Sequence, residues 1–148
     1  MKNNKWIYFD MDGTLNRFYD VPNWLPMLQA EDPTPYEIAK PLVNMNVLAR
    51  KLNKLSREGW HIGIISWLSK CSSPSYDEAV TAAKIKWIKT HLKSVTFEEI
   101  NIVSYGVNKW EVCGKGILFD DEDKNRETWE GKAYHPSEMM EVLSSLLA

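Results

Sequence analysis

The chain of 148 residues is long enough for one globular domain of ordinary size. With 44% hydrophobic and 26% charged residues, its composition excludes an intrinsically disordered polypeptide. A formal net charge of -2 excludes a broadly basic nucleic-acid-binding protein, although recognition of a single nucleotide or strand end stays open. No apolar run suits a signal peptide or a membrane span, and Cys71 and Cys113 form no Cys-x-x-Cys pair. We therefore expect a cytoplasmic protein that does not engage a membrane.

Hydrophobic periodicity predicts strands that alternate with helices along the chain. Pro41 is expected to open the first long helix and Gly59 to end it. Five prolines between positions 16 and 41 exclude a long helix there and favour an ordered, turning excursion. The expected strands are 5–9, 61–66, 100–103, 116–119 and 133–135, and the expected helices are 41–58, 74–92 and 136–147.

The predicted strands are almost continuously apolar, which is typical of a sheet that helices cover on both faces. We therefore expect an α/β, Rossmann-like three-layer sandwich with a mostly parallel central sheet. No repeat or linker divides the sequence, so residues 1–148 are expected to form a single domain. Ligands of such sheets bind at the carboxyl ends of the strands, and Asp10, Ser66 and Asp120 each stand at such an end.

Asp10 and Asp12 follow the first apolar run and are separated by one residue. In an extended chain these side chains point to the same face, where two like charges repel strongly in a partly dry site. A hard divalent cation such as magnesium relieves this repulsion. Gly13 lets the chain turn sharply, and we expect the Thr14 hydroxyl to bind the backbone of the turn. The alternative is a polar turn whose carboxylates cap a helix or face water.

The sequence Asp10-Met11-Asp12-Gly13-Thr14-Leu15, after four apolar residues, closely resembles the first motif of the haloacid dehalogenase-like superfamily. This resemblance implies that Asp10 is a nucleophile that attacks phosphorus and forms an aspartyl-phosphate. It further implies that Asp12 is the general acid and base of the reaction, with its backbone carbonyl as a metal ligand.

Three later segments match the remaining motifs of the superfamily in order. Ser66 closes the second predicted strand, where its hydroxyl and the backbone N–H of Trp67 would hold a phosphoryl oxygen. Lys109 matches the lysine that neutralises the phosphoryl group and the nucleophile. Lys115 is the alternative candidate for this lysine, because it is nearer to Asp120 in the sequence. It stands, however, where a strand begins, at the opposite end of the sheet from the site.

Asp120 and Asp121 follow the fourth predicted strand and match the acidic pair of the fourth motif. The resemblance implies that Asp10, Asp12, Asp120 and Asp121 bind Mg²⁺, and which of Asp120 and Asp121 binds it directly stays open. The implied activity is that of a magnesium-dependent phosphomonoesterase. Because a dehalogenase needs no general acid at Asp12, phosphoryl chemistry is favoured. The alternative is a non-enzymatic binding or regulatory protein that retains the fold.

Members of the superfamily choose substrates largely through cap insertions. Here the short segment 16–41, rich in proline and aromatic residues, takes the place of a full cap, so the chain resembles capless or minimally capped members. Its motif intervals are loosely similar to those of small nucleotidase-like phosphatases. A phosphorylated substrate is the expected partner, with a nucleotide or nucleic-acid end as a favoured class. Whether the protein forms a homo-oligomer stays open. Aromatic rings could stack on a base or simply fill the core; they belong to Phe18, Tyr19, Trp24, Tyr36, Trp67 and Trp110.

Overall fold

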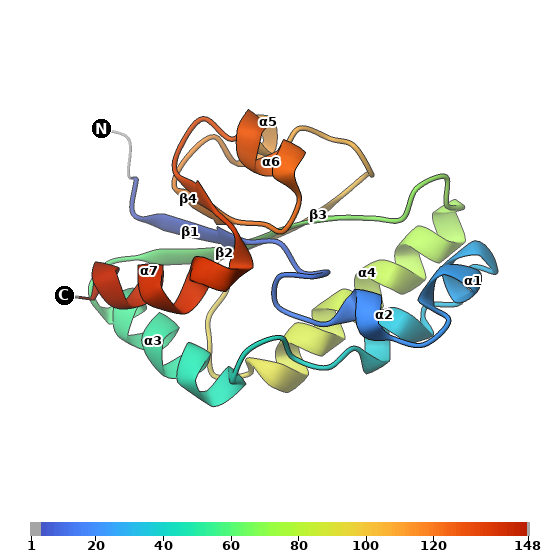
Figure 1. The fold of residues 1–148 in the computed structure, drawn as a ribbon, viewed down its shortest axis with the longest axis horizontal. Coiled ribbons are helices and arrows are strands. Elements are labelled where there is room, and N and C mark those ends of the chain that lie inside the picture. Colours follow the sequence, from blue (N-terminus) through green and yellow to red (C-terminus); the bar gives the residue numbers. More distant parts are fainter. Residues whose placement is uncertain (1–3, 148) are drawn as a thin grey trace.

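The computed structural model describes residues 4–147, and its centre is one sheet in which every pair of neighbouring strands is parallel (Figure 1). The strand order is β3-β2-β1-β4-β5, so the first strand lies in the middle. This arrangement confirms the predicted α/β class with a mostly parallel sheet. The strands are β1 (Trp6–Phe9), β2 (His61–Trp67), β3 (Glu99–Val103), β4 (Ile117–Phe119) and β5 (Ala133–Tyr134).

Helices cover both faces of the sheet (Figure 1). On one face α3 (Met45–Arg57), α4 (Pro74–His91) and α7 (Met139–Leu146) pack against the side chains of Phe9 and Ile64. On the other face the neighbouring residues Tyr8 and Ile65 contact the region of α5 (Lys109–Cys113) and α6 (Asp123–Thr128). Successive side chains of a strand alternate between faces, which explains why β1 and the middle of β2, Ile62–Ile65, are almost continuously apolar. No helix among residues 4–147 is long and apolar enough to span a membrane.

The segment 16–41 holds a short 3-10 helix, η1 (Phe18–Asp20), and two short helices, α1 (Trp24–Gln29) and α2 (Thr34–Ile38). These helices lie beside the first half of α4 (Figure 1). Phe18 and Tyr36 pack there against Tyr76 and Val80 of α4 in a small apolar cluster of their own. The segment is therefore an ordered insertion without a long helix, as its prolines predicted.

Several predicted boundaries are wrong. The helix expected from Pro41 begins after Asn44, because the Asn44 side chain caps it by accepting a hydrogen bond from the backbone N–H of Val47. Pro41 pairs instead with Asn16, in the chain that leaves β1. The last helix begins at Met139, after a 3-10 turn, and the short helices α5 and α6 were not predicted.

Leu52 tests the packing of α3 against the sheet. Its side chain is fully buried in the core, so Leu52→Ala is expected to lower the free energy of unfolding by about 2–5 kcal/mol. Urea denaturation followed by circular dichroism measures this loss. The control is Lys54→Ala, at an exposed position of the same helix, which is expected to change stability by less than about 0.5 kcal/mol. Equal losses in the two variants would contradict the packing described here.

Candidate active site

The carboxyl ends of β1 and β4 place two buried aspartates next to each other. The backbone N–H of Asp10 donates to the carbonyl of Phe119, and that of Asp120 donates to the carbonyl of Tyr134. The sheet pairing thus continues one residue beyond each strand and brings both aspartates to the same edge. Asp10 is 6% exposed and Asp120 is fully buried. Local strand geometry therefore positions both carboxylates at this edge.

The chain turns away from β1 at Gly13, whose φ of +81° favours glycine. The side-chain oxygen of the buried Asn16 accepts hydrogen bonds from the backbone N–H groups of Gly13 and Phe18, which fixes the turn. The hydroxyl of Thr14 donates to Oδ2 of Asp10 at 3.0 Å. The expectation that this hydroxyl binds the turn backbone was therefore wrong: Thr14 orients the carboxylate of Asp10 instead.

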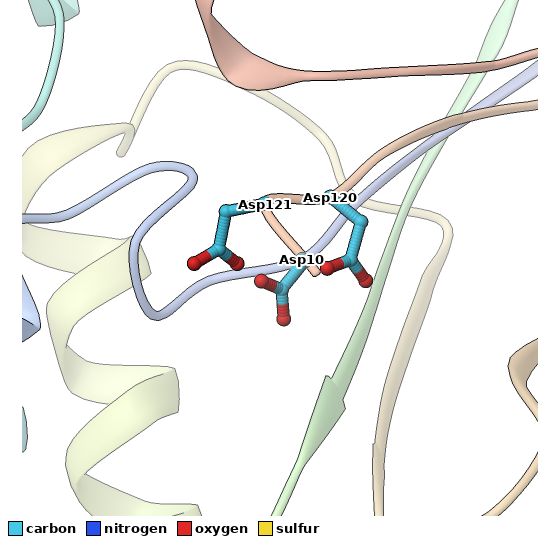
Figure 2. Close-up of side chains that lie close together, drawn as sticks. All are labelled: Asp10, Asp120 and Asp121. Carbon is cyan, nitrogen blue, oxygen red and sulfur yellow. The ribbon is translucent and has the colours of Figure 1, made fainter. Parts of the chain in front are cut away.

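Asp10, Asp120 and Asp121 form a cluster of carboxylates, each with an oxygen within 4.8 Å of the others (Figure 2). Lys109 lies in the same cluster, and its Nζ is 3.1 Å from Oδ1 of Asp10 and 2.6 Å from Oδ2 of Asp120. Its side chain is only 2% exposed. When ionised, three carboxylates face one ammonium here, which leaves two negative charges in this cluster without a cation.

The surroundings of the cluster shift the pKa values of its members. Burial, and then the charge of Asp10, raise the pKa of both Asp120 and Asp121. Burial acts to lower the pKa of Lys109, but Asp10 and Asp120 outweigh it and raise that pKa. The raised pKa values mean that further negative charge is unfavourable beside Asp10, and a cation would relieve this cost. The all-oxygen donors of Asp10, Asp120 and Asp121 fit a hard divalent cation such as magnesium, which would favour their ionised forms.

The carboxylate of Asp12 has a different environment from those of the cluster. Its Oδ2 accepts a hydrogen bond from Lys84 Nζ at 3.0 Å, and its Oδ1 accepts one from the side-chain amide of Asn16 at 3.4 Å. Burial raises the pKa of Asp12, and the charge of Lys84 partly offsets this rise. The side chain of Asp12 therefore stands apart from the cluster of Asp10, Asp120 and Asp121, and a metal contact through its backbone carbonyl stays a prediction.

The end of β2 brings Ser66 and Trp67 to the same region. Ser66 is 1% exposed, and its hydroxyl oxygen lies 2.6 Å from Lys84 Nζ. The ring of Trp67 lies 5.3 Å from Lys109 Nζ, and its indole N–H donates to the carbonyl of Val107. Trp67 therefore holds the loop that leads to Lys109.

Two further lysines lie in different places: Lys115 lies away from the site, at the opposite end of the sheet as the sequence predicted, whereas Lys84 lies within it. Lys115 pairs with Glu99, the first residue of β3, and does not contact the carboxylate cluster. Lys84 was missed, although it is 1% exposed and contacts Asp12 and Ser66. The signal for it was a lysine among the apolar residues Val80, Ala83, Trp87 and Ile88, which lie on the buried side of α4. A lysine at such a position needs a buried acceptor.

A cavity of about 270 Å³ opens over Asp10, Asp12, Lys109 and Asp121. The insertion forms one wall of the cavity, and the segments after β2 and β3 form another. Glu122 and Asn125 also line it, and the Asn125 amide donates to Oδ2 of Asp120. The apolar and aromatic side chains of its wall are Phe18, Tyr19, Trp24, Leu25, Leu28, Tyr36, Trp67, Leu68 and Tyr105.

The architecture is the Rossmann-like α/β fold with a parallel central sheet that the sequence predicted. Among solved structures, the chain is similar to the D,D-heptose 1,7-bisphosphate phosphatase from Burkholderia thailandensis. The TM-score is 0.55, the sequence identity is 11%, and the match covers 97% of this chain and 98% of that one. At this identity the likeness shows the fold. The sequence matches no protein-family model and no curated protein.

Gly13 tests the arrangement of the carboxylate cluster. A Cβ atom at this position would lie 2.9 Å from Cγ of Asp121, so Gly13→Ala is expected to displace that carboxylate and weaken magnesium binding. In the original protein, magnesium at a hundredfold excess over its Kd should stabilise the folded state by about 2.7 kcal/mol. Thermal unfolding with and without magnesium measures this gain, which Gly13→Ala should largely lose.

Gly106→Ala is the matched control for this experiment. Gly106 also has a positive φ, +88°, but a Cβ there would meet no atom within 4 Å. This variant should suffer only the backbone strain, on the order of 1–2 kcal/mol, and should keep the stabilisation by magnesium. A magnesium effect that survives in Gly13→Ala, or disappears in both variants, would contradict a role for Asp121 in metal binding.

Proposed function

We propose that this protein is a magnesium-dependent phosphomonoesterase that works through an aspartyl-phosphate on Asp10. The observation that carries the proposal is the pairing of Asp10 with a buried lysine beside two further carboxylates, at the carboxyl edge of a parallel sheet. This edge is where such folds bind ligands. The likeness to a solved phosphatase supports the same class of reaction.

In the first step, an oxygen of Asp10 attacks phosphorus and the bond between phosphorus and the ester oxygen breaks. Lys109 and the Thr14 hydroxyl hold the carboxylate of Asp10 in one orientation for this attack. Asp12 gives its proton to the leaving oxygen, a role that suits a carboxyl group whose pKa burial raises.

In the second step, Asp12 takes a proton from water, which attacks phosphorus and breaks its bond to Asp10. Inorganic phosphate is released and Asp10 is restored. Magnesium, when bound, supplies positive charge that stabilises the phosphoryl oxygens. Ser66 and Lys109 contribute a hydroxyl donor and an ammonium for the same oxygens.

For the substrate we propose a nucleoside monophosphate. The aromatic residues divide into two groups by exposure: Phe18 and Tyr36 are 2% and 4% exposed and fill an apolar cluster, whereas Tyr19 and Tyr105 are 49% and 52% exposed at the cavity. Trp67 is half-buried and contacts Tyr105, with ring centroids 4.9 Å apart. The exposed ring of Tyr105, beside a phosphate site and in contact with Trp67, suits the flat face of a base.

Asp10→Asn tests the reaction. This change removes the nucleophile while nearly preserving shape, so we expect the loss of all measurable hydrolysis of an aryl phosphate and an unchanged circular dichroism spectrum. Ser66→Ala is expected to weaken turnover without abolishing it. The assay compares the variants with the original protein, with and without magnesium. Equal magnesium-dependent turnover in Asp10→Asn and the original protein would contradict the proposed mechanism.

Tyr105→Ala tests the substrate class. If its exposed ring stacks on a base, the variant should raise KM for a nucleoside monophosphate by about tenfold, since one stacking contact contributes about 1–3 kcal/mol. The KM for glycerol phosphate and for a sugar phosphate, which carry no base, should stay unchanged. A preference of the original protein for sugar phosphates, or for a single-stranded 5′-phosphorylated oligonucleotide, would overturn the choice of a mononucleotide.

A further inference from the structure

Lys84 is a buried cation that the roles proposed above do not use. It lies in the middle of α4, is 1% exposed, and reaches the edge of the sheet with its Nζ. Its Nζ is 3.0 Å from Oδ2 of Asp12, 2.6 Å from Oγ of Ser66 and 2.7 Å from the carbonyl oxygen of Trp67. An ammonium group has three protons, so these three acceptors satisfy it completely.

The three acceptors come from two different strand ends. Asp12 follows β1, whereas Ser66 and Trp67 end β2. Because β1 and β2 are neighbours in the sheet, a single ammonium from the helix can reach both ends. The ring of Tyr36, from the insertion, lies 5.1 Å from the same Nζ. Lys84 therefore joins three parts of the site that lie far apart in the sequence.

The direction of the hydrogen bond to Ser66 has a chemical consequence. An ammonium can only donate, so the hydroxyl oxygen of Ser66 accepts from Lys84 and its proton remains available for another acceptor. Within residues 4–147, the hydroxyl of Ser66 donates no hydrogen bond to another protein group. In the reaction proposed above, a phosphoryl oxygen at the sheet edge is an acceptor of the required kind.

We infer that Lys84 is a positioning residue of the active site, which holds Asp12 and Ser66 in one geometry and keeps the Ser66 hydroxyl oriented as a donor to the phosphoryl group. The inference rests on the proposed phosphatase function. Lys84 does not touch the substrate in this scheme, because its three protons are already bound. Its effect on catalysis passes through Ser66 and Asp12.

A double-mutant cycle tests this inference. Lys84→Met removes the three donors and retains an unbranched side chain, and it should lower kcat/KM by about a hundredfold, since misplacing groups of the site has effects of this size. Ser66→Ala should cause a smaller loss. If Lys84 acts through Ser66, adding Ser66→Ala to Lys84→Met should cause almost no further loss. Losses that simply multiply would overturn the inference.

Two further variants separate positioning from general support of the fold. Lys86→Met, at an exposed position of the same helix, should leave kcat/KM unchanged. If Lys84→Met does not fold, Lys84→Gln, which keeps a side-chain N–H donor, takes its place in the cycle. An equal loss of activity in Lys86→Met would overturn the inference, because that side chain contacts neither Asp12 nor Ser66.

Binding of inorganic phosphate, measured by calorimetry in the presence of magnesium, tests the same coupling without turnover. Lys84→Met and Ser66→Ala should each weaken binding, and the double variant should bind as weakly as Lys84→Met alone. If the original protein hydrolyses phosphate esters but the effects of Lys84→Met and Ser66→Ala multiply, the inferred role of Lys84 is overturned. The proposed function is then unaffected. An original protein that neither hydrolyses any ester nor binds phosphate would overturn the proposed function, and the inference with it.

Discussion

The repulsion among buried carboxylates is the constraint on which the rest of the site depends. Asp10, Asp120 and Asp121 bring their oxygens within 4.8 Å of one another, and folding removes much of the water that would screen them. Lys109 offsets part of this charge from within the cluster. The fold thus tolerates a destabilising cluster of like charges, as is common at functional sites, and the proposed binding of a cation and a phosphoryl group gives this cluster a use.

Two buried lysines divide the acidic groups into two sets. Lys109 forms ion pairs with Asp10 and Asp120, whereas Lys84 forms one with Asp12. Asp10 and Asp12, the proposed nucleophile and the proposed general acid, are two residues apart in the sequence and yet have separate cationic partners. Their environments differ accordingly, which is how one chain can assign different chemical roles to similar side chains.

The sequence predicted the parallel α/β fold and the position of the aspartates at the strand ends, because both follow from local patterns. Apolar runs mark the buried strands, and polar residues directly after Phe9 and Phe119 mark the strand ends. The apolar neighbours of Lys84 in α4 indicate that it is buried, but they do not identify its partners, which are 72 and 18 residues away in the sequence. The start of α3 was missed because Pro41 pairs with Asn16 rather than opening the helix.

The insertion and the candidate active site share side chains, and this has a consequence for how the protein can change during evolution. Tyr36 belongs to the apolar cluster of the insertion, lines the cavity over the carboxylates and covers the ammonium of Lys84. Its hydroxyl is also bound to Ser69, just beyond β2. If the protein is the proposed phosphatase, mutations that remodel this segment for a new substrate would also disturb Lys84 and the end of β2. Substrate preference and reaction rate would then not change independently of each other during evolution.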